Sequence, residues 1–316
     1  MMMYLYLVGG LVLLLVAGDL LVRGAITLAT RLSIPPLIIG LTIVSFGTSA
    51  PELIISLDAA FKGLGGISIG NVVGSNITNI LLVLGLPALI RPTQCAESGT
   101  RSSTVYMIAV TIVFSALCLQ GVLDITSGVI LLALLVFFLS WTVWTSRKQR
   151  GVPCDLVDQD LLEEAPANLG IAILFMIIGL LGLPLGGHLT IEGASTIART
   201  WGVSEAVVGL TVVALGTSLP ELATTLVAAI RNQGAMAFGN VIGSNIFNIL
   251  AIMGLTASII PVKVPERVIG HDLLFMLATA LLMLLFTVFK MELTRVRGAL
   301  MVLIYAAYVT LAFVIN

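Results

Sequence analysis

The sequence predicts an all-α integral membrane protein with ten transmembrane helices, arranged as two inverted five-helix repeats. Three observations lead to this fold class: a very apolar composition, ten apolar runs of suitable length, and two segments that each occur twice at one spacing. Hydrophobic residues make up 59% of the 316 residues, charged residues only 10%, and the mean hydropathy is +1.15. A soluble domain carries about 25% charged residues. We therefore expect lipid to cover much of the surface of this chain.

Ten apolar runs of the sequence reach or approach the length of about 20 residues that a helix needs to cross a bilayer. They lie at about 3–22, 36–61, 66–90, 104–119, 122–145, 168–187, 205–230, 234–260, 271–289 and 296–315. The one long polar stretch separates the fifth run from the sixth. The chain is therefore expected to consist of a first half at 1–146, a linker at 147–167 and a second half at 168–316.

An internal repeat supports this division. The segment Gly40–Leu53 recurs as Gly209–Leu222 with ten of 14 positions identical, and Gly70–Leu81 recurs as Gly239–Leu250 with ten of 12 identical. Both second copies follow the first copies by 169 residues, which indicates a duplicated unit. Each unit holds five predicted helices, an odd number, so the second unit enters the membrane from the opposite side. This is the inverted-repeat plan of many secondary transporters.

Lysine and arginine are distributed unevenly between the two sets of predicted loops. With the N-terminus outside, the inner loops would hold eleven of these residues and the outer loops four. Because cytoplasmic loops carry an excess of basic residues, we expect both termini outside and the linker in the cytoplasm. The expected location is the cell membrane, inner or plasma, with several passes.

Two glutamates, Glu52 and Glu221, lie midway along apolar runs at matching positions of the repeat. A lone carboxylate inside a bilayer costs several kcal/mol, so each marks a candidate functional site. A proline precedes each glutamate and removes one helical hydrogen bond. Unwound backbone at this depth is tolerated only where it lines a cavity or an ion. We therefore expect carbonyl groups near Thr48 and Thr217 to point away from the helical ladder.

Neutral oxygens accompany both carboxylates. On the helical faces predicted by spacings of three, four and seven residues stand Ser45, Thr48, Ser49, Thr217, Ser218, Ser75, Asn79, Ser244 and Asn248. Taken singly, such polar residues serve equally well as contacts between helices. Together, oxygen ligands without thiolate or imidazole suit hard cations such as Ca²⁺ and Na⁺. Two carboxylates neutralise one divalent ion and repel each other without it, so the emptied pair must take up protons or monovalent cations. That requirement is the physical basis of an antiporter.

The repeated segments resemble the α-repeats of the calcium/cation antiporter superfamily and, within it, sodium/calcium exchangers of the prokaryotic type. The shared motifs are G-T-S-x-P-E, at Gly47–Glu52 and Gly216–Glu221, and G-N-x-x-G-S-N, at Gly70–Asn76 and Gly239–Asn245. The resemblance implies four ion sites between α-repeats at about 36–90 and 205–260. It also implies two long tilted helices that slide across the core to alternate access.

The same resemblance implies a ligand set. Ca²⁺ would be held by Glu52 and Glu221, with the carbonyls of Thr48 and Thr217. Na⁺ would use the same glutamates with Ser49, Ser218, Ser75, Ser244 and the carbonyls of Ser45 and Ala214. Asn79 and Asn248 depart from relatives that carry Asp at one of these positions. Potassium-dependent relatives use an Asp there, so this departure argues against potassium coupling and leaves the stoichiometry open.

We therefore expect a secondary active antiporter that exchanges Na⁺ for Ca²⁺, with the lipid bilayer as its surroundings. No cofactor or nucleic acid is expected, and no protein partner can be read from the sequence. The alternative is a proton/calcium exchanger of the same superfamily, which typically has an acid where this chain has Gly74 and Gly243. A passive channel and an intramembrane enzyme are more distant alternatives. The two histidines, His188 and His271, stand outside both repeats, near predicted helix ends.

One charged pair near the predicted end of the first helix also has two interpretations. Asp19 and Arg23 are four residues apart, which suits an ion pair on one helical face. Alternatively, the two side chains border an access path to the site.

Overall fold

The computed structural model describes residues 2–94, 99–148, 166, 168–202 and 214–314, which are mostly helical. The first half contains α1 (Met2–Leu32), α2 (Pro36–Ile39), η1 (Gly40–Val44), α3 (Ser45–Thr48), α4 (Ala50–Phe61), α5 (Gly65–Thr78), η2 (Asn79–Val83), α6 (Gly85–Ile90), α7 (Thr100–Cys118) and α8 (Ile125–Lys148). The second half contains α10 (Leu169–Thr200), α12 (Ala214–Thr217), α13 (Leu219–Ile230), α14 (Gly234–Phe247), η4 (Asn248–Met253), α15 (Gly254–Ile259), η5 (Val268–Asp272), α16 (Leu273–Val288) and α17 (Arg295–Val314). The η elements are π-helical turns.

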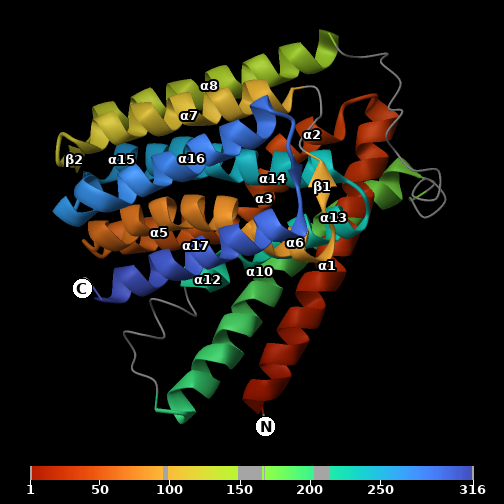
Figure 1. Cartoon of the computed structure of the whole chain (residues 1–316), viewed down its shortest axis with the longest axis horizontal. Coiled ribbons are helices and arrows are strands. Elements are labelled where there is room, and N and C mark those ends of the chain that lie inside the picture. Colours follow the sequence, from red (N-terminus) through yellow and green to blue (C-terminus); the bar gives the residue numbers. More distant parts are fainter. Residues whose placement is uncertain (1, 95–98, 149–165, 167, 203–213, 315–316) are drawn as a thin grey trace.

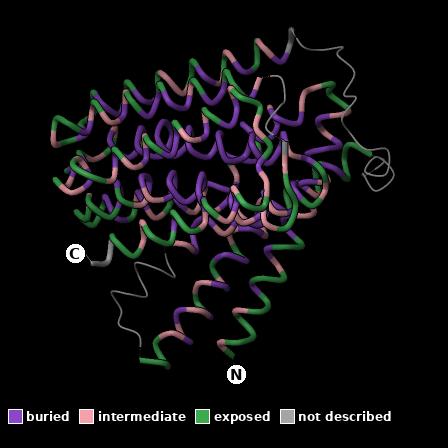
Figure 2. The backbone as a smooth tube through the Cα atoms, viewed as in Figure 1, coloured by how far each residue is buried: buried purple, intermediate pink, exposed green. Residues whose placement is uncertain are grey.

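Most helices run side by side, while α1 and α10 lie along each other and cross the rest obliquely (Figure 1). The buried residues concentrate in the inner helices (Figure 2), and α14 is buried from Ala235 to Phe247. The outer faces carry exposed large apolar side chains, such as Leu5, Val136 and Leu181. Exposed apolar surface on this scale marks a membrane-facing protein. The chain is therefore a multi-pass helical membrane protein.

Seven helices of the described residues are long and apolar enough to cross a membrane, or eight if one bent pair counts as a single span. The bent pair is Pro36–Thr48 with Ala50–Phe61, at 44°. Helices occupy the described part of each of the ten predicted runs. The predicted run at 205–230 lies partly outside the described residues, and its helix from Leu219 to Ile230 is too short to count as a span by itself.

The first and sixth predicted helices are longer than expected. The predictions ended near residues 22 and 187, whereas α1 continues to Leu32 and α10 to Thr200. The placement of Asp19, Arg23 and His188 near helix ends was therefore wrong, because all three lie inside a helix. The extension of α1 is stabilised by burial, since Gly24 to Thr27 are buried and Gly24 packs against α10. A helix longer than the bilayer thickness is accommodated by tilting.

Two short antiparallel strand pairs join the two halves. Strand β1 (Thr93–Gln94) pairs with β4 (Glu292–Leu293), and β2 (Val122–Leu123) pairs with β3 (Val262–Lys263). Each pair takes one strand from each half, so the halves contact each other outside the helical core as well. The predicted linker at 147–167 begins within α8, which extends to Lys148, and apart from residue 166 the rest of it lies outside the described residues.

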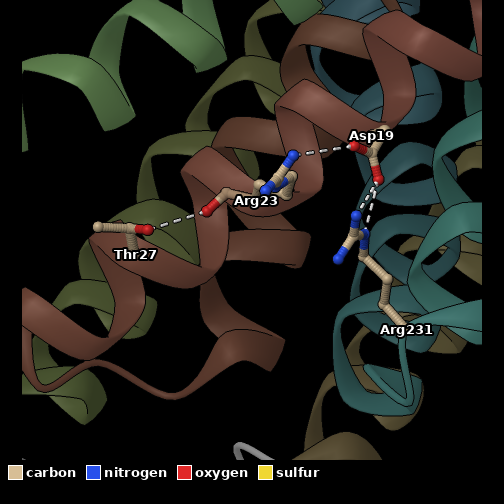
Figure 3. A network of polar contacts seen from close by, with 4 residues as sticks. All are labelled: Asp19, Arg23, Thr27 and Arg231. Carbon is tan, nitrogen blue, oxygen red and sulfur yellow. Dashed lines mark hydrogen bonds and ion pairs between the residues drawn. The ribbon is translucent and has the colours of Figure 1, made fainter. Parts of the chain in front are cut away.

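The predicted ion pair of Asp19 and Arg23 is present, but it is the weaker of two contacts of Asp19 (Figure 3). The distance from Asp19 Oδ2 to the Arg23 guanidinium is 3.7 Å, whereas Asp19 Oδ1 lies 2.6 Å from two nitrogens of Arg231. Arg231 follows α13, in the second half. This aspartate therefore links the first helix to the opposite repeat, an interaction that the sequence spacing did not indicate.

We expect Arg231→Gln to lower the free energy of unfolding by about 1 kcal/mol. The ion pair between Arg231 and Asp19 is only partly exposed, and the distance between its charged atoms is short. The side chains of Arg231 and Asp19 are 17% and 32% exposed. Lys62→Gln is the matched control, since the pair of Lys62 and Asp58 is as short, at 2.6 Å, but 62% and 58% exposed. Thermal unfolding in detergent measures both. Equal losses in the two variants would contradict a stabilising role specific to Arg231.

Candidate cation site

The two glutamates occupy the first turns of matching helices. Glu52 lies in the first turn of α4 and Glu221 in the first turn of α13, each directly after a proline. The helices break one residue before these turns, at Ser49 with φ −84° and ψ 7°, and at Ser218 with φ −86° and ψ 5°. The interruption expected at each proline is therefore present. Because helix N-termini stabilise negative charge, both carboxyls stand where an anion is favoured.

Both carboxyl groups are buried in the helical core. Glu52 and Glu221 are each 0% exposed. Ser49 of the first half donates a hydrogen bond of 2.9 Å to Glu221 Oε1 of the second half. Within the described part of the chain, Glu52 Oε1, Glu52 Oε2 and Glu221 Oε2 accept no hydrogen bond. Two buried carboxylates without enough hydrogen-bond donors call for a positive partner.

Neutral oxygens without partners lie on helices that pack against those of the two glutamates. Among the described residues, ten buried side-chain polar atoms have no hydrogen-bond partner, and seven of them belong to predicted ligands. Besides the three carboxylate oxygens, these are Asn79 Oδ1, Asn248 Oδ1, Ser218 Oγ and Ser244 Oγ. An unpaired buried polar group costs about 1–3 kcal/mol. Because the cost falls mostly on oxygen atoms of the predicted ligands, the arrangement suits a hard cation.

The remaining predicted ligands are also buried where they are described. Thr48, Ser75 and Thr217 are at most 3% exposed. The Ser45 hydroxyl donates to the carbonyls of Gly40 and Asn240, so it holds η1 against α14. The Ser45 carbonyl accepts hydrogen bonds from the Ser49 amide and the Thr48 hydroxyl.

The backbone of Ala214 begins α12, and its side chain lies outside the described residues. Its equivalent in the first half is Ser45, so the hydroxyl that holds η1 to α14 has no counterpart in the second half. The two halves of the site therefore differ in this contact.

Sequence reasoning missed one pair of asparagines that hold the glutamate backbone. Asn71 Nδ2 donates to the carbonyl of Glu52 at 3.2 Å and to Ser56 Oγ at 3.0 Å. Asn240 Nδ2 donates to the carbonyl of Glu221 at 3.4 Å and to Thr225 Oγ1 at 3.0 Å. The available signal was the second residue of the G-N-x-x-G-S-N motif, which is repeated together with the glutamates. A second missed pair, Asn76 and Asn245, closes the same motif.

In the residues that the structure describes, no group of three or more His, Cys, Asp or Glu side chains could hold a metal ion. The negative charge around the candidate site therefore comes from the glutamate pair, and the other ligand atoms are neutral oxygens. A buried, all-oxygen site with two carboxylates in an apolar helical bundle is typical of a membrane transporter for small hard cations.

Comparison with known proteins agrees with this class. The sequence profile described as "Sodium/calcium exchanger protein" matches residues 2–144 and 171–314. The chain belongs to the sodium/calcium exchanger family, as the repeated motifs indicated. It is 31% identical to the sodium/calcium exchanger MaX1 of Methanosarcina acetivorans, over 99% of each chain. It is 37% identical to the inner membrane protein YrbG of Escherichia coli, over 87% of this chain and 86% of that one.

The fold is also similar to a solved structure of the same family. The sodium-calcium exchanger NCX_Mj, soaked with Na⁺ and Ca²⁺, matches with a TM-score of 0.85 at 31% identity, over 98% of each chain. The resemblance to the family is therefore confirmed, and the protein is a membrane antiporter of the cation/Ca²⁺ type. Membership of a transporter family is also consistent with the expectation that the chain is not an enzyme.

Proposed function

We propose that this protein exchanges Na⁺ for Ca²⁺ across the cell membrane by alternating access, with Glu52 and Glu221 as shared ligands at the membrane centre. The observation that carries the proposal is that seven of the ten unpartnered buried polar atoms among the described residues are oxygens of predicted ligands, drawn from both repeats and including these two carboxyls. Ca²⁺ neutralises the pair as a single divalent ion, and Na⁺ ions replace it on the return step. The remaining proposed ligands are Thr48, Ser49, Thr217, Ser218, Ser75, Ser244, Asn79, Asn248 and the carbonyls of Ser45 and Ala214.

The proposed architecture is ten spans in two inverted halves, at 1–146 and 168–316, with α-repeats at about 36–90 and 205–260. Support comes from the strand pairs, because β1 pairs with β4 and β2 with β3, an exchange that a twofold relation between the halves would produce. The lysine and arginine distribution supports termini outside and the linker at 147–167 in the cytoplasm.

Packing at one of two glycines favours sodium over proton coupling. The proton/calcium branch typically carries an acid at the positions of Gly74 and Gly243, and Gly243 is the crowded one. A Cβ atom added to Gly243 would stand 2.6 Å from the carbonyl oxygen of Leu41 and 2.8 Å from its Cα. Both are backbone atoms of the opposite half, which a side chain at residue 243 would have to displace. An acidic residue at position 243 would therefore have to displace this backbone, whereas a Cβ atom added to Gly74 would meet nothing within 4 Å among the described residues.

The test is ⁴⁵Ca²⁺ uptake into proteoliposomes preloaded with Na⁺, compared with vesicles preloaded with K⁺, choline or acidic buffer. We expect uptake only with an outward Na⁺ gradient, because two vacated carboxylates need monovalent cations to return.

Uptake that follows the pH gradient and ignores Na⁺ would overturn sodium coupling in favour of proton coupling. Uptake without any gradient, persisting when both glutamates are replaced by glutamine, would overturn the site as well. A steady leak that saturates poorly with Ca²⁺ would point to a channel.

A further inference from the structure

The two asparagines that close the repeated motif bond to each other across the interface between the halves. Asn76 Nδ2 donates to the Asn245 carbonyl at 3.3 Å, and Asn245 Nδ2 donates to the Asn76 carbonyl at 3.4 Å. Each amide nitrogen has a methionine sulfur as its second acceptor, Met276 for Asn76 and Met107 for Asn245. Both asparagines are 2% exposed. The pair is therefore reciprocal, buried and built from both repeats.

These backbone contacts determine which way the two amides face. A carbonyl oxygen only accepts hydrogen bonds, so the side-chain atom directed at it must be the NH₂ group. The Oδ1 atoms of Asn76 and Asn245 consequently point the other way. There, Asn76 Oδ1 accepts from Asn248 Nδ2 and Asn245 Oδ1 accepts from Asn79 Nδ2, both at 3.1 Å.

The orientation of the Asn76 and Asn245 amides determines the orientation of the two proposed ligand amides, those of Asn248 and Asn79. Because Asn79 and Asn248 must each present their NH₂ group to an oxygen of the opposite half, their own Oδ1 atoms face away from that contact. Among the described residues, neither Oδ1 atom has a hydrogen-bond partner, and both side chains are at most 1% exposed. In the opposite orientation each would present NH₂ groups, which repel a cation.

We infer that Asn76 and Asn245 are positioning residues: each fixes the amide of the ligand in the other half, Asn248 and Asn79 respectively, so that an oxygen faces the cation. This inference rests on the proposed function, since it takes both amides as cation ligands. It also ties the two repeats together at the site, because each half sets the orientation of a ligand that belongs to the other.

The inference predicts a crossed pattern of energetic coupling. Loss of Asn76 acts only through Asn248, and loss of Asn245 acts only through Asn79. Loss of a residue that orients a metal ligand typically weakens metal binding by about 10- to 100-fold. Removing the orienting residue after its ligand has gone should have almost no further effect, whereas removing it together with the ligand of its own half should multiply the two losses.

The experiment is equilibrium ⁴⁵Ca²⁺ binding to the purified protein in nanodiscs. The alanine variants of Asn76, Asn245, Asn79 and Asn248 are compared with the four double variants that combine one orienting residue and one ligand. Size-exclusion profiles and thermal unfolding confirm that each variant is folded, and serine variants enter the same cycles wherever an alanine variant does not fold. Thr78→Val is the control, because Thr78 is buried beside Asn79 but bonds to Gly74 and Tyr305.

We expect each orienting variant to weaken Ca²⁺ binding by at least about tenfold. The double variant of Asn76 and Asn248 should bind like the Asn248 variant alone, and that of Asn76 and Asn79 should show the product of the two losses. Multiplicative losses in all four doubles, or losses as large in Thr78→Val, would overturn the inference while leaving the proposed function standing. A folded wild-type protein that binds no ⁴⁵Ca²⁺ would overturn the proposed function and the inference with it.

Discussion

Replacing either Glu52 or Glu221 by glutamine is expected to reduce Na⁺-driven Ca²⁺ uptake by at least about 100-fold. Removing one unit charge about 4 Å from a monovalent cation costs about 4 kcal/mol at an effective dielectric constant of about 20, which is about a thousandfold in affinity, and a divalent ion loses about twice that energy. Both carboxyls are fully buried, so bulk water screens them little. Glutamine keeps the shape of the side chain, and at residue 221 it still accepts the hydrogen bond of Ser49.

The matched control for this prediction is Asp58→Asn. Asp58 stands on α4, the helix that carries Glu52, but its side chain is 58% exposed and paired with Lys62. Uptake by this variant should equal that of the wild type. If either glutamine variant kept half of the wild-type uptake, that carboxyl would not be a ligand of the transported ion. If only one of the two glutamine variants lost uptake, the result would contradict a site in which Glu52 and Glu221 bind the same ion.

The second large effect is expected from a single added carbon atom at Gly239. This glycine of α14 packs directly against Gly40 of η1, and a Cβ atom would stand 3.2 Å from the Gly40 Cα and against the Leu37 carbonyl. Since both neighbours are backbone, Gly239→Ala must push α2 and η1 away from α14. Overpacking of this kind costs about 1–3 kcal/mol. We expect less folded protein, and loss of uptake from the protein that does fold, because Ser45 and Thr48 contact Asn240 next to this glycine.

Gly9→Ala serves as the comparison. Gly9 lies in α1, and a Cβ atom there meets nothing within 4 Å in the part of the chain that the structure describes. Alanine is a better helix former than glycine by about 1 kcal/mol, so this variant should be neutral or slightly more stable. Thermal unfolding and monodispersity in detergent measure both variants. If Gly239→Ala and Gly9→Ala had the same thermal stability and monodispersity, the close packing of Gly40 against Gly239 would not require glycine at residue 239.

Much of the site could be predicted from the sequence because its residues violate the rule of an apolar membrane interior. Glu52 and Glu221 are conspicuous in apolar runs, the prolines before them account for the helix breaks, and the 169-residue repeat brings the two together as equivalents. Helix ends were less predictable. Asp19 interrupts the apolar pattern of α1 without ending the helix, because Arg231 of the other half compensates its charge.

The sequence by itself therefore determined the apolar class, the duplicated unit and the family, and it singled out the charged residues of the candidate site, since composition and spacing record what lipid and burial permit. Only the tertiary structure decided which residues meet across the two halves. The pairing of Ser49 with Glu221, of Asp19 with Arg231, and of Asn76 with Asn245 depends on helix packing between segments far apart in the chain. A hydrogen bond needs its two groups within about 3 Å and correctly directed, and no local pattern carries that information.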